Sequence, residues 1–177
     1  MSSGPYILVV DDEPDICDQV KEILEDEAYE VTTAATAAQA REARRARRPD
    51  LILLDIWMPD MDGISLLKEW SEGDHLPCPV IVMSGHGTVE TAVEATRLGA
   101  YDFLEKPMSL NKLLLTVKRA LEADQLARSL AFHAKRHQEG RDLRGRRLPA
   151  QDRLHGFLRR RGVQVFPPDR AMKVRDK

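Results

Sequence analysis

The chain has 177 residues and a formal net charge of −2, and 42% of its residues are hydrophobic. This length fits one domain of ordinary size with an appendage, and the apolar content is sufficient for a core. The longest apolar runs are four or five residues, far below a membrane span. The opening MSSGPYILVV has no basic n-region, so we expect no signal peptide.

The two cysteines, Cys17 and Cys78, form no CxxC pair and stand among apolar residues. This usage is typical of buried thiols in a reducing compartment rather than of a disulfide or a metal site. We therefore expect a cytoplasmic protein without membrane contact.

Charge divides the chain into two unlike parts. Residues 1–127 hold 12 Lys and Arg against 24 Asp and Glu, whereas residues 128–177 hold 15 against 5. Such an asymmetry indicates segments with different roles. We predict a domain over 1–127 and an Arg-rich tail over 128–177, which begins as a helical extension and then has little structure.

Short apolar runs and segments with helical spacing alternate along the first part. The runs that predict strands are YILVV (6–10), YEVTTA (29–34), LILL (51–54), PVIVM (79–83) and YDFL (101–104). The predicted helices follow them, over 13–28, 36–48, part of 63–72, 88–99 and from 110 onward. The run 29–34 alternates in polarity more than the others, which favours an edge strand.

Strict alternation of five strands with five helices predicts an α/β fold. Such a pattern implies a doubly wound, five-stranded parallel sheet with helices on both faces. In these sheets ligands bind beyond the carboxyl ends of the strands, where the strand order reverses. The residues that follow each strand are therefore the candidate site.

Polar or charged residues follow four of the five predicted strands. They are Asp11 and Asp12 after the first strand, Asp55 at the end of the third, Ser84 and Gly85 after the fourth, and Lys106 with Pro107 after the fifth. Each feature alone is more often an ordinary turn. Their joint occurrence at one edge of a sheet favours a site.

Three carboxylates in one place repel one another unless they are protonated or share a cation. A hard divalent ion suits them, and Mg²⁺ prefers one or two carboxylates together with waters and phosphate oxygens. With the ion present, Asp55 can stay ionised and attack phosphorus as a carboxylate nucleophile. Lys106 would neutralise phosphoryl charge, and Ser84 would donate a hydrogen bond.

The stretches ILVVDDEPD, LILLDIWMPDMDG, VMSGHG and FLEKP closely resemble the receiver domain of bacterial two-component response regulators, over residues 5 to about 125. The resemblance implies the flavodoxin-like receiver fold, with Asp55 as phosphoacceptor and Mg²⁺ as cofactor. It also implies that Asp12 and Asp55 bind the ion through their side chains. Trp57 would bind it through its backbone carbonyl, and Asp11 through water.

The same resemblance assigns roles around the phosphoryl group. Lys106 would contact it, Ser84 would be the switch hydroxyl with Gly85 beside it, and the peptide before Pro107 would be cis. Where this chain has Phe103, many receivers carry an aromatic residue, often tyrosine, that turns inward with the switch. Phe103 has no hydroxyl, so it would act by packing alone. The alternative is that it is simply a core residue.

In function, the resemblance implies a signalling switch rather than an enzyme. A sensor histidine kinase would donate the phosphoryl group to Asp55, and the chain itself would perform only slow, Mg²⁺-dependent self-phosphorylation and dephosphorylation. The face around the fourth helix, fifth strand and fifth helix would then control a partner or a homodimer, in transcriptional regulation. A phosphatase with the same nucleophile would need a second aspartate where this chain has Trp57.

The stretch MSGHGTVETAVEATRLGAYDFLEKP narrows the resemblance to receivers of nitrogen-regulation-type activators of the sigma-54 class. In those regulators an ATPase domain and a helix-turn-helix follow the receiver. This chain has no G-x-x-x-x-G-K-[ST] motif, and its last fifty residues are too few for an ATPase domain. A receiver-only protein, a truncated protein and an out-of-frame tail all fit this pattern.

The basic tail supplies an alternative hypothesis, a DNA-binding regulator acting through residues 128–177. Clustered arginines such as those of RDLRGRR and FLRRRG neutralise phosphates. The tail has no helix-turn-helix or zinc-finger spacing, however. Because it is also poor in apolar runs, a solvated tail is the favoured interpretation.

Overall fold

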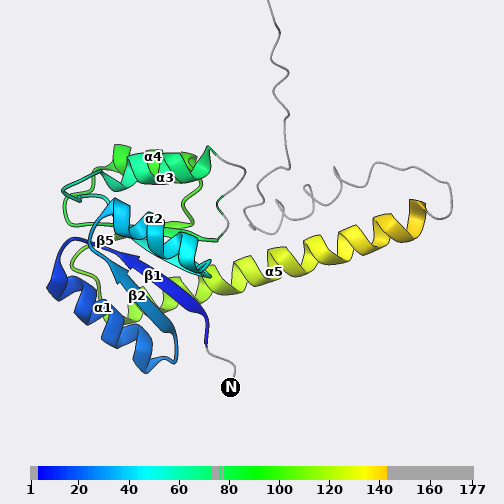
Figure 1. The fold of residues 1–177 in the computed structure, drawn as a ribbon, viewed down its shortest axis with the longest axis horizontal. Coiled ribbons are helices and arrows are strands. Elements are labelled where there is room, and N and C mark those ends of the chain that lie inside the picture. The colour runs from blue at the N-terminus through cyan, green and yellow to red at the C-terminus, as the bar shows by residue number, and fades with distance from the viewer. Residues whose placement is uncertain (1–3, 73–75, 77, 143–177) are drawn as a thin grey trace, which may run out of the picture. The chain divides into compact units, whose positions relative to one another are not determined.

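The computed structural model describes residues 4–72, 76 and 78–142 (Figure 1). The elements in chain order are β1 (Tyr6–Val10), α1 (Pro14–Asp26), β2 (Glu30–Ala34), α2 (Ala37–Ala46), β3 (Leu51–Asp55), α3 (Gly63–Ser71), β4 (Val80–Ser84), α4 (Val89–Arg97), β5 (Asp102–Glu105) and α5 (Leu110–Asp142). The predicted alternation of strand and helix is therefore confirmed. Of the predicted tail, residues 143–177 lie outside the described residues.

The chain divides into two units, residues 1–122 and residues 123–177, and the sheet belongs to the first unit. Cys17 and Cys78 are both buried and are not joined in a disulfide. Among the described residues, no helix is both long enough and apolar enough to cross a membrane.

The five strands form one sheet in the order β2-β1-β3-β4-β5, and every neighbouring pair is parallel. β2 lies at an edge, as its alternating sequence predicts, and buries only Val31 and Ala34. The chain leaves β1 to one side to form β2, then returns past β1 to form β3. The strand order therefore reverses between β1 and β3, and a ligand site is expected beyond their carboxyl ends.

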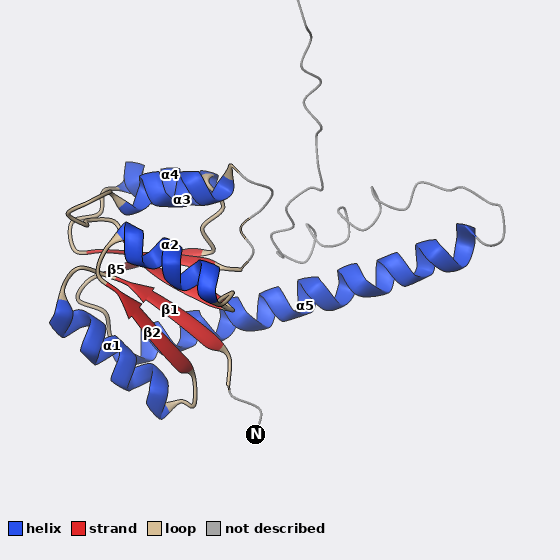
Figure 2. Ribbon diagram, in the orientation of Figure 1, coloured by secondary structure: helices blue, strands red, loops and turns tan. Residues whose placement is uncertain are grey.

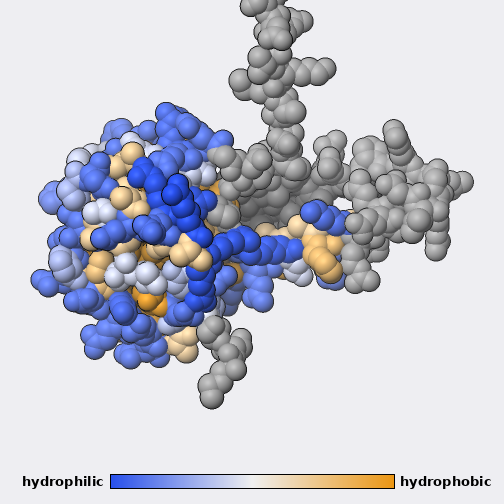
Figure 3. Space-filling model, viewed as in Figure 1, coloured by the Kyte–Doolittle hydropathy of each residue, from blue (hydrophilic) through white to orange (hydrophobic). Residues whose placement is uncertain are grey.

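Helices cover both faces of the sheet, as Figure 2 shows. α2, α3 and α4 pack on one face, where Leu67 joins a core with Leu8. α1 and α5 pack on the other, where Val117 joins a core with Ile7. Because successive strand residues point to opposite faces, both of which are buried, β1 is a continuous apolar run, and β3 and β4 are apolar up to their last residues, Asp55 and Ser84. The outer sides of α1 and α2 are mainly hydrophilic in the view of Figure 3.

Local capping explains where several helices begin and end. α2 begins one residue later than predicted because Thr36 is its N-cap, accepting a hydrogen bond from the Gln39 N–H at 3.1 Å. Asp62 caps α3 in the same way, at 2.9 Å from the Ser65 N–H. After α4, Gly99 has a φ of 99°, a conformation that glycine adopts without strain at a helix end.

Candidate functional site

Four strands bring polar side chains to one edge of the sheet. Asp11 follows β1 directly, Asp55 ends β3, Ser84 ends β4 and Lys106 follows β5. The strands are parallel, so their carboxyl ends meet at the same edge. Asp11 and Ser84 are 0% exposed and Asp55 is 2% exposed. Polar groups this deeply buried require partners.

Three carboxylates form an acidic cluster at this edge. Oxygen atoms of Asp11, Asp12 and Asp55 all lie within 4.8 Å of one another, with Asp12 exposed and the other two buried. Asp11 Oδ1 accepts a hydrogen bond of 3.0 Å from the Glu13 N–H. Its buried Oδ2 atom makes no hydrogen bond of regular geometry to any described residue and is instead ion-paired with Lys106 Nζ.

Lys106 supplies positive charge to the cluster. Its Nζ atom lies 2.6 Å from Asp11 Oδ2 and 3.1 Å from Asp55 Oδ1. A third carboxylate, Glu13 Oε1, lies 3.2 Å away. Sequence reasoning missed Glu13, although its place directly after the aspartate pair, at the N-cap of α1, was a usable signal. One ammonium group therefore lies within ion-pair distance of three carboxylates, those of Asp11, Asp55 and Glu13.

The pKa values reflect this shortage of positive charge. Burial raises the pKa of Asp55 from 3.8 to about 6; the bond to Lys106 lowers it, and the charges of Asp11 and Asp12 raise it again. Burial alone would lower the pKa of Lys106, but its bonds to Asp11 and Asp55 outweigh burial and raise that pKa above 10.5. The ammonium thus stays charged, while Asp55 ionises at a cost in the absence of a further cation.

Ser84 accepts hydrogen bonds from two backbone N–H groups. Its Oγ accepts a hydrogen bond of 3.2 Å from the His86 N–H, and its carbonyl accepts one of 2.8 Å from the Lys106 N–H. Phe103 is half-buried against the core and also reaches the loop after β4. A Cβ atom on Gly87 would lie only 2.3 Å from Phe103 Cζ. Gly85, the remaining predicted residue of this loop, is exposed.

The loop after β3 starts and ends beside Asp55. The Gly63 N–H donates a 2.7 Å hydrogen bond to the Ile56 carbonyl. A Cβ atom on Gly63 would lie 2.1 Å from the Asp55 carbonyl oxygen, so the return requires glycine. Within the loop, Trp57 is 61% exposed. After β5, the Lys106–Pro107 peptide is cis.

Comparison with known proteins identifies the family to which the fold belongs. The sequence profile of the response regulator receiver domain matches residues 7–118. The chain is 48% identical over 126 residues to the nitrogen assimilation regulatory protein NtrX of Azorhizobium caulinodans, which covers 70% of this chain and 28% of that protein. The chain spans only a quarter to a third of the length of such curated relatives.

Two solved structures give the same result. The crystal structure of the receiver domain of NtrX from Brucella abortus is 51% identical, with a TM-score of 0.62, over 66% of this chain and 98% of that one. The solution structure of the beryllofluoride-activated NtrC4 receiver domain dimer is 45% identical, also with a TM-score of 0.62, over 66% of this chain and 96% of that one. These two receiver structures are therefore similar to this chain in both fold and sequence.

Proposed function

The chain belongs to the response regulator receiver domain family, and on this premise we propose that it is a phosphoryl-accepting switch in two-component signalling, with Asp55 as the acceptor. One observation carries the proposal. Asp55 ends β3 almost fully buried, 3.1 Å from Lys106 Nζ and within 4.8 Å of the Asp11 and Asp12 oxygens. This arrangement joins a carboxylate nucleophile, a cation and candidate metal ligands.

The donor set fits Mg²⁺. Asp12 and Asp55 would hold the ion through their side chains, Trp57 through its backbone carbonyl and Asp11 through a water molecule. All of these donors are oxygens, which a hard divalent ion prefers. The carboxylates of Asp11, Asp12 and Asp55 gather around one ammonium group, that of Lys106, so the cluster keeps negative charge for a cation. When bound, Mg²⁺ neutralises part of the charge on the cluster and on a phosphoryl group.

Asp55 is the group that reacts. One of its carboxylate oxygens attacks the phosphorus of a phosphohistidine on a sensor histidine kinase. The new O–P bond forms as the N–P bond breaks, and the histidine nitrogen keeps the electron pair. Lys106 stabilises negative charge on the transferring oxygens. In this proposal the chain is a signalling protein whose own chemistry is limited to slow, Mg²⁺-dependent self-phosphorylation and dephosphorylation.

Ser84 would convert the modification into a conformational change. Its hydroxyl oxygen now accepts a hydrogen bond from the His86 N–H. Rotation toward a phosphoryl group would break that bond and release the loop before α4. Phe103, which packs against Gly87 of this loop, would follow by packing. A differential interaction of a few kcal/mol is sufficient to shift such an equilibrium.

The output surface in this proposal is the face of α4, β5 and α5. On these helices Val89 is 77% exposed, Val93 44% and Leu115 49%. In this proposal these side chains contact a partner or a second copy of the chain. The related NtrC4 receiver is described as a dimer in its beryllofluoride-activated form. We extend the proposal to transcriptional regulation, which the sequence resemblance implies.

Intact-protein mass spectrometry tests the proposal. The wild type, Asp55→Asn and the matched control Asp18→Asn, an exposed aspartate of α1, are each incubated with acetyl phosphate and MgCl₂. We expect one added phosphoryl group on the wild type and the control, none on Asp55→Asn, and none on any protein when EDTA replaces MgCl₂. Labelling of Asp55→Asn to the wild-type level would contradict the proposal.

A further inference from the structure

The loop between β3 and α3, residues 56–62, has few anchors of its own between its two ends. Its ends are fixed by the Ile56 N–H, which donates to the Met83 carbonyl at 3.1 Å, and by Gly63. Between them Trp57 and Pro59 are exposed, whereas Met58 and Met61 are half-buried and pack against the core. The position of this backbone segment therefore depends on contacts from outside the loop.

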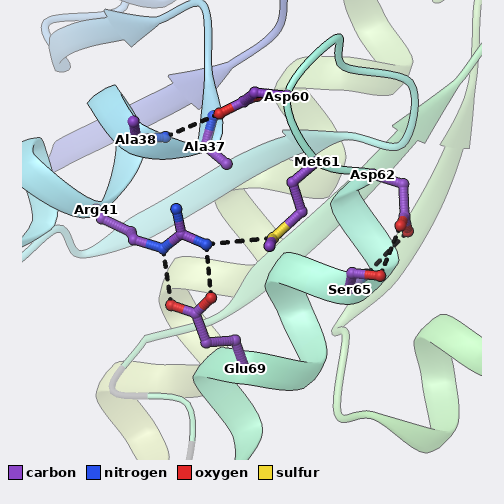
Figure 4. Close-up of polar contacts among 8 residues, drawn as sticks. All are labelled: Ala37, Ala38, Arg41, Asp60, Met61, Asp62, Ser65 and Glu69. Atoms are coloured by element: carbon purple, nitrogen blue, oxygen red, sulfur yellow. Dashed lines mark hydrogen bonds and ion pairs between the residues drawn. The ribbon is translucent and has the colours of Figure 1, made fainter.

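Asp60 provides such a contact. Its Oδ1 accepts a hydrogen bond from the Ala37 N–H at 3.0 Å, and its Oδ2 accepts one from the Ala38 N–H at 3.2 Å. Figure 4 shows the carboxylate beside the start of α2. A carboxylate at a helix N-terminus also meets the positive end of the helix dipole. The bond to Ala37, with that to Ala38, lowers the pKa of Asp60 below 3.8, so it stays ionised at neutral pH.

α2 does not need Asp60 as its only cap. Thr36 already accepts a hydrogen bond from the Gln39 N–H, and Gln39 Oε1 accepts one of 2.8 Å from the Ala35 N–H. These bonds form a local cap of the kind that begins most helices. Asp60 instead joins segments that are 22 and 23 residues apart. It is thus a tether between the loop and α2.

A second contact from α2 reaches the next residue of the loop. Arg41 Nη2 donates to Met61 Sδ at 3.2 Å. The same guanidinium binds both carboxylate oxygens of Glu69 on α3, at 2.9 and 2.7 Å, as Figure 4 shows. A bidentate pair of this kind fixes the orientation of the arginine. α2 therefore holds two consecutive loop residues, Asp60 and Met61.

We propose that Asp60 is a positioning residue for the metal site, because its tether to α2 holds in place the loop that carries Trp57. The inference rests on the proposed function, in which the Trp57 carbonyl is an Mg²⁺ ligand. Pro59, with its fixed φ, stands between Trp57 and Asp60 and limits how far the two can move independently. Mg²⁺ demands near-ideal ligand geometry, so release of the tether lowers its affinity.

The test is an MgCl₂ titration of the full chain, followed by the NMR signal of the Trp57 indole N–H. Loss of groups that orient metal ligands typically costs about 10-fold to 100-fold in affinity. We expect Asp60→Ala to raise the Kd for Mg²⁺ about tenfold, at the lower end of that range. Asp60→Asn, which keeps the shape and one acceptor oxygen, gives a smaller increase and serves if the alanine variant folds poorly.

Thr36→Ala is the matched control. It removes a cap from the same end of α2 without touching the loop, so it lowers thermal stability while the Kd stays unchanged. An unaltered Kd in both Asp60 variants would overturn the inference. So would an equal rise in Thr36→Ala, because Asp60 would then act only through helix stability. A wild type that shows no response to MgCl₂ would overturn the proposed function as well, which separates the two failures.

Discussion

Replacing Asp55 by asparagine is expected to stabilise the metal-free protein at neutral pH. Asp55 is 2% exposed, and the fold raises its pKa from 3.8 to about 6. Each pKa unit corresponds to about 1.4 kcal/mol between the two protonation states. Ionised Asp55 therefore destabilises the fold by up to ~3 kcal/mol above pH 6. Asparagine resembles the neutral carboxylic acid in shape and avoids this cost.

The pH dependence follows from the direction of the shift. Below pH 3.8 the carboxyl group is protonated in both the folded and the unfolded chain, so Asp55 contributes no pH dependence. Between 3.8 and about 6 the folded chain binds more protons at this site than the unfolded chain. Stability therefore falls as pH rises through this window, and the loss is complete above it. Asp55→Asn lacks this decrease.

Urea denaturation in EDTA at pH 4 and pH 7 measures the effect, with Asp18→Asn as the control. We expect Asp55→Asn to exceed the wild type by about 2–3 kcal/mol at pH 7 and by less than about 1 kcal/mol at pH 4. Saturating MgCl₂ should narrow the gap, because an ion that binds only the folded wild type stabilises it. A variant no more stable than the wild type at pH 7 would show that ionised Asp55 does not destabilise the fold.

Three further outcomes are expected. Lys106→Met leaves buried Asp11 and Asp55 without their cation. Urea denaturation in EDTA at pH 7 should therefore show that the free energy of unfolding falls by about 3–5 kcal/mol. An unchanged urea midpoint would argue against the ion pairs. Gly63→Ala places a Cβ atom 2.1 Å from the Asp55 carbonyl, and labelling by acetyl phosphate should fall sharply, whereas labelling at the wild-type rate would show that the loop yields. Burial raises the pKa of Cys17 from 9.0 to about 11. Iodoacetamide at pH 8 should therefore modify Cys17 far more slowly in the folded protein than in urea. Equal rates of modification would contradict this.

The fold could be predicted from the sequence because its central strands are buried on both faces. Every residue of β1, β3 and β4 is buried, and apart from the strand-end Asp55 and Ser84 only apolar residues occupy these positions. The edge position of β2 was readable for the opposite reason, since its exposed residues are polar. Helix ends were less accurate, as at Thr36, because a capping residue resembles the helix that it begins.

The strand order predicts that Asp11, Asp55 and Lys106 lie close together, since each stands at the end of a strand. Contacts made by residues outside the strand ends could not be predicted from the strand order. Glu13 bonds to a residue 93 positions away, and Asp60 bonds to α2 across 22 and 23 positions. Neither contact has a periodic signal in the sequence, because each depends on how two loops or helix ends meet after folding.

The position of the phosphoryl group shows directly whether Asp55 is the phosphoacceptor. After incubation of the full chain with acetyl phosphate and MgCl₂, borohydride reduction converts an aspartyl phosphate to homoserine, and peptide mass spectrometry then locates it. We predict homoserine at position 55 alone, dependent on MgCl₂. Homoserine in place of Asp11, Asp12 or another acidic residue, with Asp55 unmodified, would show that Asp55 is not the phosphoacceptor.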